Sequence, residues 1–147
     1  GYCIVSTAKR NGLRLIAVVM KESEPKVRNQ EVSQLLDYGF SLYENVILFK
    51  KDDIIEKIPI ENARQKSVEV VCKEDVVYVK DKSAQDEVTY EMNYTNLVPP
   101  IKKGETIGHI LLMRSDVNIA SFEVVSKDDI EALTLPEKMY NYFKAFV

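Results

Sequence analysis

The stretch EVTYEMNYT, residues 87–95, decides the fold class of this chain. It alternates strictly: polar residues take one side of an extended chain, and the other side carries Val88, Tyr90, Met92 and Tyr94. A period of two is typical of a strand with one buried face. The stretch therefore predicts a half-buried strand in a mainly β protein.

Similar short runs lie on both sides of this strand. They are rich in β-branched and aromatic residues and are separated by charged or Asn-containing turns. Short strands at this spacing favour a small antiparallel β-sandwich. The flanking runs cover residues 46–49, 54–60, 67–72, 76–80, 107–114 and 118–125.

The first residues, GYCIVSTAKRNGLRLIAVVM (1–20), predict a β-hairpin ahead of the sandwich. Two apolar runs, about residues 2–8 and 13–20, flank the dipeptide Asn11-Gly12. Asn-Gly is a preferred pair for a two-residue hairpin turn, because both positions need a positive φ. We expect two neighbouring antiparallel strands here.

A helix is predicted to follow the hairpin. Ser23 or Glu24 can cap it, and Pro25 suits its first turn. Apolar residues then recur at helical spacing, and Gly39 is expected to end the helix. The recurring residues are Val32, Leu35, Leu36 and Phe40.

The last residues, LTLPEKMYNYFKAFV (133–147), return to a helical period. Pro136 can open a helix whose other side carries Glu137, Lys138, Asn141 and Lys144. The apolar stripe consists of Met139, Tyr140, Phe143, Phe146 and Val147. Because a helix of this length is well short of a roughly 30 Å hydrocarbon core, it could lie in a membrane interface without crossing it. The alternative is a helix that packs back on the sandwich.

The composition is that of a globular domain, since 46% of the 147 residues are hydrophobic and 29% are charged. The formal net charge of −3 leaves no overall basic footprint, so we expect no nucleic-acid partner. No run of about 18 apolar residues predicts a transmembrane span.

Two tetrads match the Ser-x-x-Lys pattern of acyl-transfer enzymes, Ser6 with Lys9 and Ser23 with Lys26. In that chemistry the lysine amine activates a serine one helical turn away, so both groups must share a helix face. Ser6 and Lys9 fall on a predicted strand, where positions three apart point to opposite sides. The second pair spans a helix entry with Pro25 between its members. We expect neither pair to be catalytic.

Metal-binding signals are weak. Cys3, Cys72 and the single histidine, His109, lack ligand-like spacing, so we expect no metal site and no cofactor. The pairs Asp52-Asp53 and Asp128-Asp129 fit a solvated turn and a helix start better than a cation site.

The segment KKGETIG (102–108) carries two glycines, Gly104 and Gly108, which we expect to be turn glycines. A phosphate loop would need the Gly-Lys-Ser/Thr ending that this segment lacks. His109 follows inside an apolar run, without a candidate nucleophile nearby, and is expected to be a sheet residue. The residues therefore predict no complete active site, and we assign no catalytic residue.

Two segments carry a family resemblance. GYCIVSTAKRNGLRLIAVVM, followed by VRNQEVSQLLDYGF (27–40), resembles the end of the catalytic domain of D-alanyl-D-alanine carboxypeptidases. These enzymes are low-molecular-weight penicillin-binding proteins that trim peptidoglycan stem peptides. VPPIKKGETIGHI (98–110) resembles the Pro-x-Lys-Lys-Gly-x-x-x-Gly segment of the β-rich domain that follows in this family.

The resemblance implies three parts. Residues 1–42 would be the last hairpin and helix of the α/β penicillin-recognising, transpeptidase-like catalytic domain. Residues 43–127 would be the β-sandwich C-terminal domain, and residues 128–147 a C-terminal amphipathic helical segment that starts a membrane anchor. The family's Ser-x-x-Lys, Ser-x-Asn and Lys-Thr-Gly motifs would precede Gly1, so this chain alone is expected to be inactive and to act as a spacer and positioning module.

The resemblance also implies an activity for the parent protein. A serine would attack the D-Ala-D-Ala peptide carbonyl without metal or organic cofactor, and β-lactams would trap the acyl-enzyme. The expected partners are the stem peptide and β-lactams through the catalytic domain, a membrane surface through the C-terminal helix, and a second copy through residues 1–42. The expected location is extracytoplasmic, on the outer face of the bacterial cytoplasmic membrane. The alternative is a non-catalytic scaffold or interaction module of a degenerate penicillin-binding protein.

Arg28 is the one substrate-binding candidate that the resemblance suggests. In some family members an arginine at the matching place lies near the terminal carboxylate of the substrate, which suits a guanidinium. The alternative is a solvated arginine on a helix face.

Overall fold

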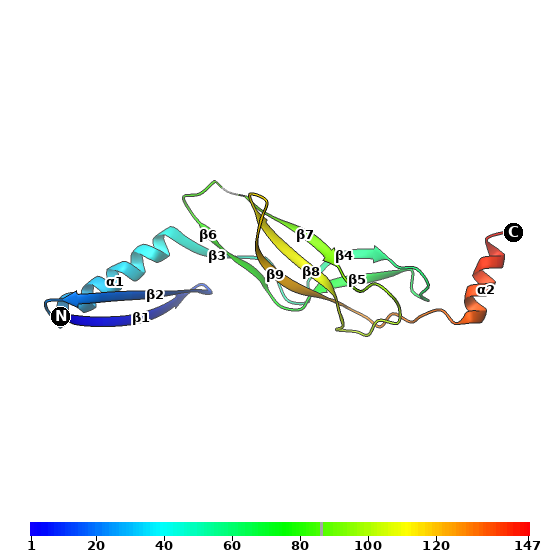
Figure 1. Cartoon of the computed structure of the whole chain (residues 1–147), viewed down its shortest axis with the longest axis horizontal. Helices are drawn as coiled ribbons and strands as arrows, with labels where there is room; N and C mark the ends of the chain where they lie inside the picture. Colours follow the sequence, from blue (N-terminus) through cyan, green and yellow to red (C-terminus); the bar gives the residue numbers. More distant parts are fainter. Residues whose placement is uncertain (86) are drawn as a thin grey trace. The chain divides into compact units, whose positions relative to one another are not determined.

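The computed structural model of the chain describes residues 1–85 and 87–147, which form strands and two helices (Figure 1). These residues divide into two compact units, Gly1–Ile47 with Val77–Gln85 and Leu48–Val76 with Asp86–Val147. In chain order the elements are β1 (Tyr2–Arg10), β2 (Leu13–Glu22), α1 (Pro25–Leu42), β3 (Tyr43–Phe49), β4 (Ile54–Pro59), β5 (Ser67–Cys72), β6 (Val76–Asp81), β7 (Val88–Tyr94), β8 (Thr106–Arg114), β9 (Val117–Ser126) and α2 (Leu135–Lys144).

The predicted hairpin is confirmed in the first unit. β1 and β2 pair in antiparallel register from Arg10 opposite Leu13 to Ile4 opposite Val19. The turn residues Asn11 and Gly12 have φ values of 47° and 81°. Both values are positive, as a tight two-residue turn between twisted strands requires.

Helix α1 covers one face of this hairpin. The buried cluster joins Ala17 and Val19 of β2 to Val32 and Leu36 of α1. The predicted apolar spacing therefore identified the packing face of the helix, although Leu35 itself is 47% exposed. The other face of the hairpin leaves large apolar side chains exposed: Val5, Ile16, Val18 and Met20.

The prediction that Gly39 ends α1 is wrong. The helix continues to Leu42, and its C-cap is Tyr43, whose backbone N–H donates to the Gly39 carbonyl. A Cβ atom on Gly39 would lie 2.6 Å from Cδ1 of Leu15 on β2. Gly39 therefore allows close packing of the helix on the hairpin and is not a helix terminator, because no left-handed backbone is needed there.

β3 pairs with β6 in a two-stranded sheet that directly follows α1. The backbone N–H of Lys82, just after β6, donates to the carbonyl of Leu42 at 2.8 Å. The side chain of Lys82 also donates to the Phe40 carbonyl at 3.2 Å. The end of α1 is thus tied to the segment that follows β6.

The second unit contains a five-stranded antiparallel sheet in the order β4-β5-β9-β8-β7 (Figure 1). Its core is aliphatic because β5, β8 and β9 each turn β-branched or leucine side chains inward. The fully buried aliphatic residues are Val68, Val70, Val76, Ile101, Ile107, Ile110, Leu112 and Val124. The predicted fold class, mainly β with antiparallel sheets, an N-terminal hairpin and helix, and a C-terminal helix, is confirmed.

The two edge strands of this sheet, β4 and β7, are linked by side chains. The hydroxyl of Tyr94 on β7 donates to the carboxylate of Glu56 on β4. Tyr90 on β7 also meets Phe49 edge to face, with ring centroids 5.2 Å apart. The predicted alternation of residues 87–95 therefore places its aromatic side chains against other elements of the unit.

Gly108 corrects another prediction. Gly104 lies in a turn with a φ of 79°, as expected, but Gly108 lies inside β8, opposite Tyr94 of β7. A Cβ atom on Gly108 would lie 2.4 Å from the carbonyl oxygen of Asn93. This glycine is required by the close approach of two strands and not by a turn.

After β9, the chain pairs briefly with the segment that precedes β8. Ile101 and Ile130 form an antiparallel bridge with backbone hydrogen bonds of 2.9 and 2.7 Å. Asp128 and Asp129 lie in this segment, well before α2, and Asp129 accepts the backbone N–H of Lys103 at 2.8 Å. The prediction that this acidic pair starts a helix is therefore wrong, because Thr134 caps the helix instead.

α2 begins at Leu135, and none of its ten residues is buried. No helix in the described residues is long and apolar enough to cross a bilayer. The predicted domain boundaries at 42/43 and 127/128 stay predictions. The two compact units are defined by contacts within the structure, whereas the predicted boundaries concern the domains of the related family.

Candidate functional site

Arg28 lies in the first turns of α1 and is half-buried. Its guanidinium donates to the carbonyl of Cys3 at 3.4 Å and to Oδ1 of Asn29 at 3.2 and 3.0 Å. The contact with Cys3 ties the start of the helix to the start of β1. The side chain therefore has structural partners, and its guanidinium retains N–H donors beyond the three that these contacts use.

Two carboxyl groups meet where β2 ends beside α1. Glu22 is the last residue of β2, and Glu31 lies on the helix. The hydrogen bond with Glu22 raises the pKa of Glu31, and partial desolvation and the charge of Glu22 add to it. Glu31 therefore holds its proton to a higher pH than a free glutamate side chain does.

The structure separates the members of the first Ser-x-x-Lys tetrad. Ser6 lies on the side of β1 that faces α1, opposite Ala17, whereas Lys9 is exposed and lies opposite Arg14. In the second tetrad, Ser23 lies in a bend before the helix. The hydrogen bonds of the described residues join neither pair.

His109 lies in β8 between Asn93 of β7 and Glu123 of β9. Glu123 binds the ammonium of Lys73 and accepts the hydroxyl of Thr106 at 3.2 Å. These contacts lower the pKa of Glu123, with the Lys73 hydrogen bond as the largest cause. His109 is thus a half-buried sheet residue beside a carboxylate that already has partners.

Cys72 is fully buried, whereas Cys3 is exposed. Burial raises the pKa of the Cys72 thiol to about 11, and the charges of Asp53 and Asp75 add to the shift. A thiol with such a pKa stays protonated and unreactive at neutral pH. Across residues 1–85 and 87–147, the structure holds no group of three His, Cys, Asp or Glu residues that could bind a metal ion.

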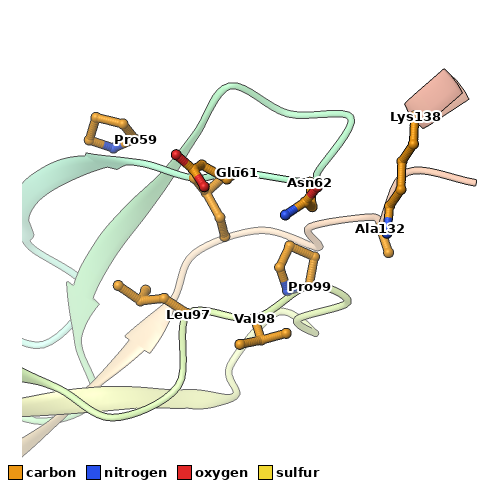
Figure 2. A pocket seen from close by; sticks show the side chains of 9 residues that line it. Pro59, Glu61, Asn62, Leu97, Val98, Pro99, Ala132 and Lys138 are labelled. Carbon is orange, nitrogen blue, oxygen red and sulfur yellow. The ribbon is translucent and has the colours of Figure 1, made fainter. Parts of the chain in front are cut away.

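A surface cavity of about 440 Å³ lies between the end of β4, the loop before β8 and the first turn of α2 (Figure 2). Pro59, Leu97 and Val98 give it an apolar wall, and Glu61 and Lys138 are its charged residues. Neither is paired with a serine, cysteine or histidine in the lining, so the cavity has no nucleophile and base for acyl transfer.

The second unit also exposes an aromatic face on α2. It contains the predicted stripe, with Met139 53%, Tyr140 66%, Phe143 63% and Phe146 75% exposed. Tyr142, which the predicted stripe omitted, belongs to this face, because its ring contacts those of Phe143 and Phe146 with centroids 6.0 and 5.0 Å apart.

The apolar stripe of the last residues does not reveal which contacts hold α2. Thr134 and Glu137 form a capping box, which the Thr-x-x-Glu spacing could have revealed. Arg64 binds both Glu131 and Glu137. No local pattern could predict this contact, since the partners are 67 and 73 residues away in the chain.

Comparisons with known proteins agree with the resemblance. The family model for the penicillin-binding protein 5 C-terminal domain matches residues 43–132. D-alanyl-D-alanine carboxypeptidase DacF of Bacillus subtilis is 32% identical over 132 residues, covering 88% of this chain and 34% of DacF. Carboxypeptidase DacA of Haemophilus influenzae is 27% identical over 145 residues, covering 97% of this chain and 37% of DacA. The chain thus spans about a third of the length of these relatives.

Solved structures agree as well. Penicillin-binding protein 5 from Haemophilus influenzae superposes with a TM-score of 0.70 and 28% identity, covering 89% of this chain and 39% of that one. Carboxypeptidase DacD from Francisella tularensis superposes with a TM-score of 0.61 and 30% identity, covering 90% of this chain and 34% of that one. The family resemblance is confirmed, because the family model alone matches more than half of the chain. The chain therefore belongs to the penicillin-binding protein 5 C-terminal domain family, whose relatives here are named D-alanyl-D-alanine carboxypeptidases.

Proposed function

We propose that this chain is the C-terminal part of a serine-type D-Ala-D-Ala carboxypeptidase and serves it as a spacer and positioning module. The observation that carries the proposal is coverage: the chain aligns along nearly all of its length with about a third of proteins named as these enzymes. In the Ser-x-x-Lys tetrads, Ser6 and Lys9 point to opposite sides of β1 and Ser23 lies in a bend before α1, which supports a catalytic centre supplied by other residues of the parent protein.

In the parent protein, a serine would attack the carbonyl carbon of the D-Ala-D-Ala peptide bond. A lysine would accept the serine proton, backbone N–H groups would stabilise the oxyanion, and the terminal D-Ala would leave. Water would then release the shortened peptide. A β-lactam would acylate the same serine and remain attached.

The proposed location is the outer face of the bacterial cytoplasmic membrane, with α2 lying in the interface. Ten helical residues rise only about 15 Å, against a hydrocarbon core of roughly 30 Å. The unburied aromatic face of α2, with Lys138 and Lys144 on the helix, suits an anionic surface.

For Arg28 we favour the structural role. Its hydrogen bonds to the Cys3 carbonyl and to Asn29 support a tie between α1 and β1. Substrate binding through the remaining guanidinium donors is the second possibility, and it would require the substrate carboxylate to approach the exposed side of α1.

The test compares the full-length protein with residues 1–147, using a fluorescent penicillin and release of D-Ala from a pentapeptide. We expect the full-length protein to be labelled and to release D-Ala, and the 147-residue chain to do neither. Labelling of the short chain would contradict its role as a spacer. A full-length protein that is not labelled would support the alternative of a degenerate, non-catalytic scaffold.

A further inference from the structure

Arg64 lies in the loop between β4 and β5 and binds two carboxylates with the two arms of its guanidinium. Nη1 lies 2.7 Å from Oε2 of Glu131, in the segment that leads to α2. Nε lies 3.0 Å from Oε1 of Glu137, in the first turn of α2. One side chain thus contacts the helix and the segment that carries it.

Backbone hydrogen bonds hold the loop of Arg64 beside the segment that leads to α2. Its own N–H donates to the Glu131 carbonyl at 2.9 Å, and the N–H of Leu133 donates to the Asn62 carbonyl at 2.8 Å. Ala63 and Ala132 form an antiparallel bridge between these contacts. The loop and the segment before α2 therefore run side by side up to the residue before the helix cap.

Glu137 completes the arrangement by serving two roles with its two oxygens. Oε2 accepts the backbone N–H and the hydroxyl of Thr134 at 2.7 and 2.8 Å, which closes the capping box. Oε1 is left for Arg64. A planar guanidinium can reach two carboxylates in fixed directions, whereas a lysine ammonium is a single flexible point charge.

These contacts matter because α2 is packed only loosely in the part of the chain that the structure describes. None of its residues is buried, so its direction depends on its first turn and on the segment that leads to it. Ion pairs with both partners about half exposed contribute little to global stability. They can still select one direction for a helix without buried residues, since local order depends on local contacts.

We infer that Arg64 is a positioning residue that fixes the direction of α2 relative to the five-stranded sheet. It thereby presents the aromatic face of the helix to the membrane at a defined angle. This consequence rests on the membrane contact proposed above, whereas the fixed direction itself does not.

Pulsed electron–electron double resonance on the 147-residue chain tests the fixed direction. Nitroxide labels are placed at Ser121 of β9 and Lys144 of α2, which are exposed, after exchange of the exposed Cys3 for serine. Cys72 can stay, because it is buried and its pKa is raised. The measured quantity is the width of the distance distribution between the two labels.

We expect a narrow distribution for the native side chain and a width greater by about twofold for Arg64→Ala and Arg64→Lys. About 1 M NaCl should widen the native distribution and leave that of Arg64→Ala unchanged, because exposed ion pairs are screened. Lys66→Ala is the matched control, since it removes a cation from the same loop without touching α2. An Arg64→Ala distribution as narrow as that of Lys66→Ala would overturn the inference.

Glu137→Gln keeps the test decisive if Arg64→Ala fails to fold. The amide oxygen preserves the cap to Thr134 while the charge that Arg64 binds is lost. We expect this variant to widen the distribution of distances between the two labels. A width equal to that of the native chain would contradict the positioning role of Arg64.

The consequence for the membrane is tested separately with Phe143→Trp, because the chain has no other tryptophan. Vesicles of phosphatidylglycerol carry quenchers at defined depths. If the tryptophan emission does not respond to vesicles, the membrane contact fails while the distance distributions still decide the role of Arg64. If it responds, we expect Arg64→Ala to broaden the quenching-depth profile, and an unchanged profile would overturn the positioning of α2 at the membrane.

Discussion

Two glycines of the chain occupy places where a side chain would meet a neighbour, but the neighbours differ. A Cβ on Gly108 would meet the backbone carbonyl of Asn93 at 2.4 Å, so β7 and β8 would have to move apart. A Cβ on Gly39 would meet only the tip of Leu15, a side chain that can rotate. The loss in the free energy of unfolding on adding a methyl group should therefore depend on whether a backbone atom or a side-chain atom must move.

We predict that Gly108→Ala lowers the free energy of unfolding by about 1–3 kcal/mol, as overpacking does in well-packed sites. Gly39→Ala should change it by less than about 1 kcal/mol, because the gain in helix propensity offsets the displacement of Leu15. Urea unfolding followed by circular dichroism measures both. Equal losses for the two variants would show that the strand contact is not the limiting one.

The carboxyl pair of Glu22 and Glu31 makes a prediction about pH. Because the folded state raises the pKa of Glu31, its contribution to stability is present below the unfolded pKa and is lost as the pH rises through the raised value. Glu31→Gln should therefore raise the melting temperature at about pH 7 and leave it nearly unchanged at about pH 4.

Thermal unfolding at the two pH values checks this prediction, with Glu24→Gln as the control. Glu24 is the N-cap residue of α1, but its side chain makes no capping hydrogen bond. A Glu31→Gln variant that behaves like Glu24→Gln at both pH values would contradict the unfavourable interaction between the Glu22 and Glu31 carboxylates.

At the scale of elements, the hairpin of β1 and β2 is packed on one side only. α1 covers the side of Ala17 and Val19, whereas Val5 and Ile16 on the other side are 71% and 70% exposed. An apolar sheet face of this kind is typical of a surface that another element or another molecule covers. We predict that the 147-residue chain self-associates through this face.

Sedimentation of the chain over a wide range of concentration measures the association. Ile16→Lys combined with Val18→Lys should shift it toward the monomer, because the two charges would be buried on association. Asn93→Lys, on the exposed side of β7, is the control. A native chain that stays monomeric at every concentration would refute the prediction.

Elements with a clear period could be predicted from the sequence, and contacts between distant elements could not. The alternation of residues 87–95 and the Asn11-Gly12 turn are local, so the strand and the hairpin followed from them. Glycine often ends helices, so Gly39 predicts a helix end, yet its role in the structure depends on Leu15 in a preceding strand. The role of Gly108 likewise depends on a contact with another strand, β7.

For the candidate site the limit is the same. The aromatic stripe of α2 is a local pattern and was predicted, apart from Tyr142. The ion pairs of Arg64 with Glu131 and Glu137 join residues that lie far apart in the sequence, so no local sequence pattern could predict them. The sequence therefore predicts the aromatic face of α2 but not the contacts that hold the helix.

For the molecule as a whole, the proposed location depends on whether α2 contacts a membrane. We predict that the chain floats with anionic vesicles in a density gradient and that a version ending at Thr134 does not. The reason is that the aromatic face of α2 is exposed and can be removed from water only by an apolar partner. High salt should weaken the flotation but not abolish it, since lysines add an electrostatic part to an apolar one.

Substitutions within α2 separate membrane contact from the loss of a terminal segment. Phe143→Glu places a charge on the aromatic face and should abolish flotation, whereas Asn141→Glu places the same charge on the polar side and should preserve most of it. Both substitutions keep the capping box of Thr134 and Glu137, so the helix start stays intact. If the version ending at Thr134 floats as well as the full chain, the membrane contact lies elsewhere in the protein. In that case the aromatic face of α2 must be covered by protein, and the two glutamate variants would then be distinguished by self-association and not by flotation.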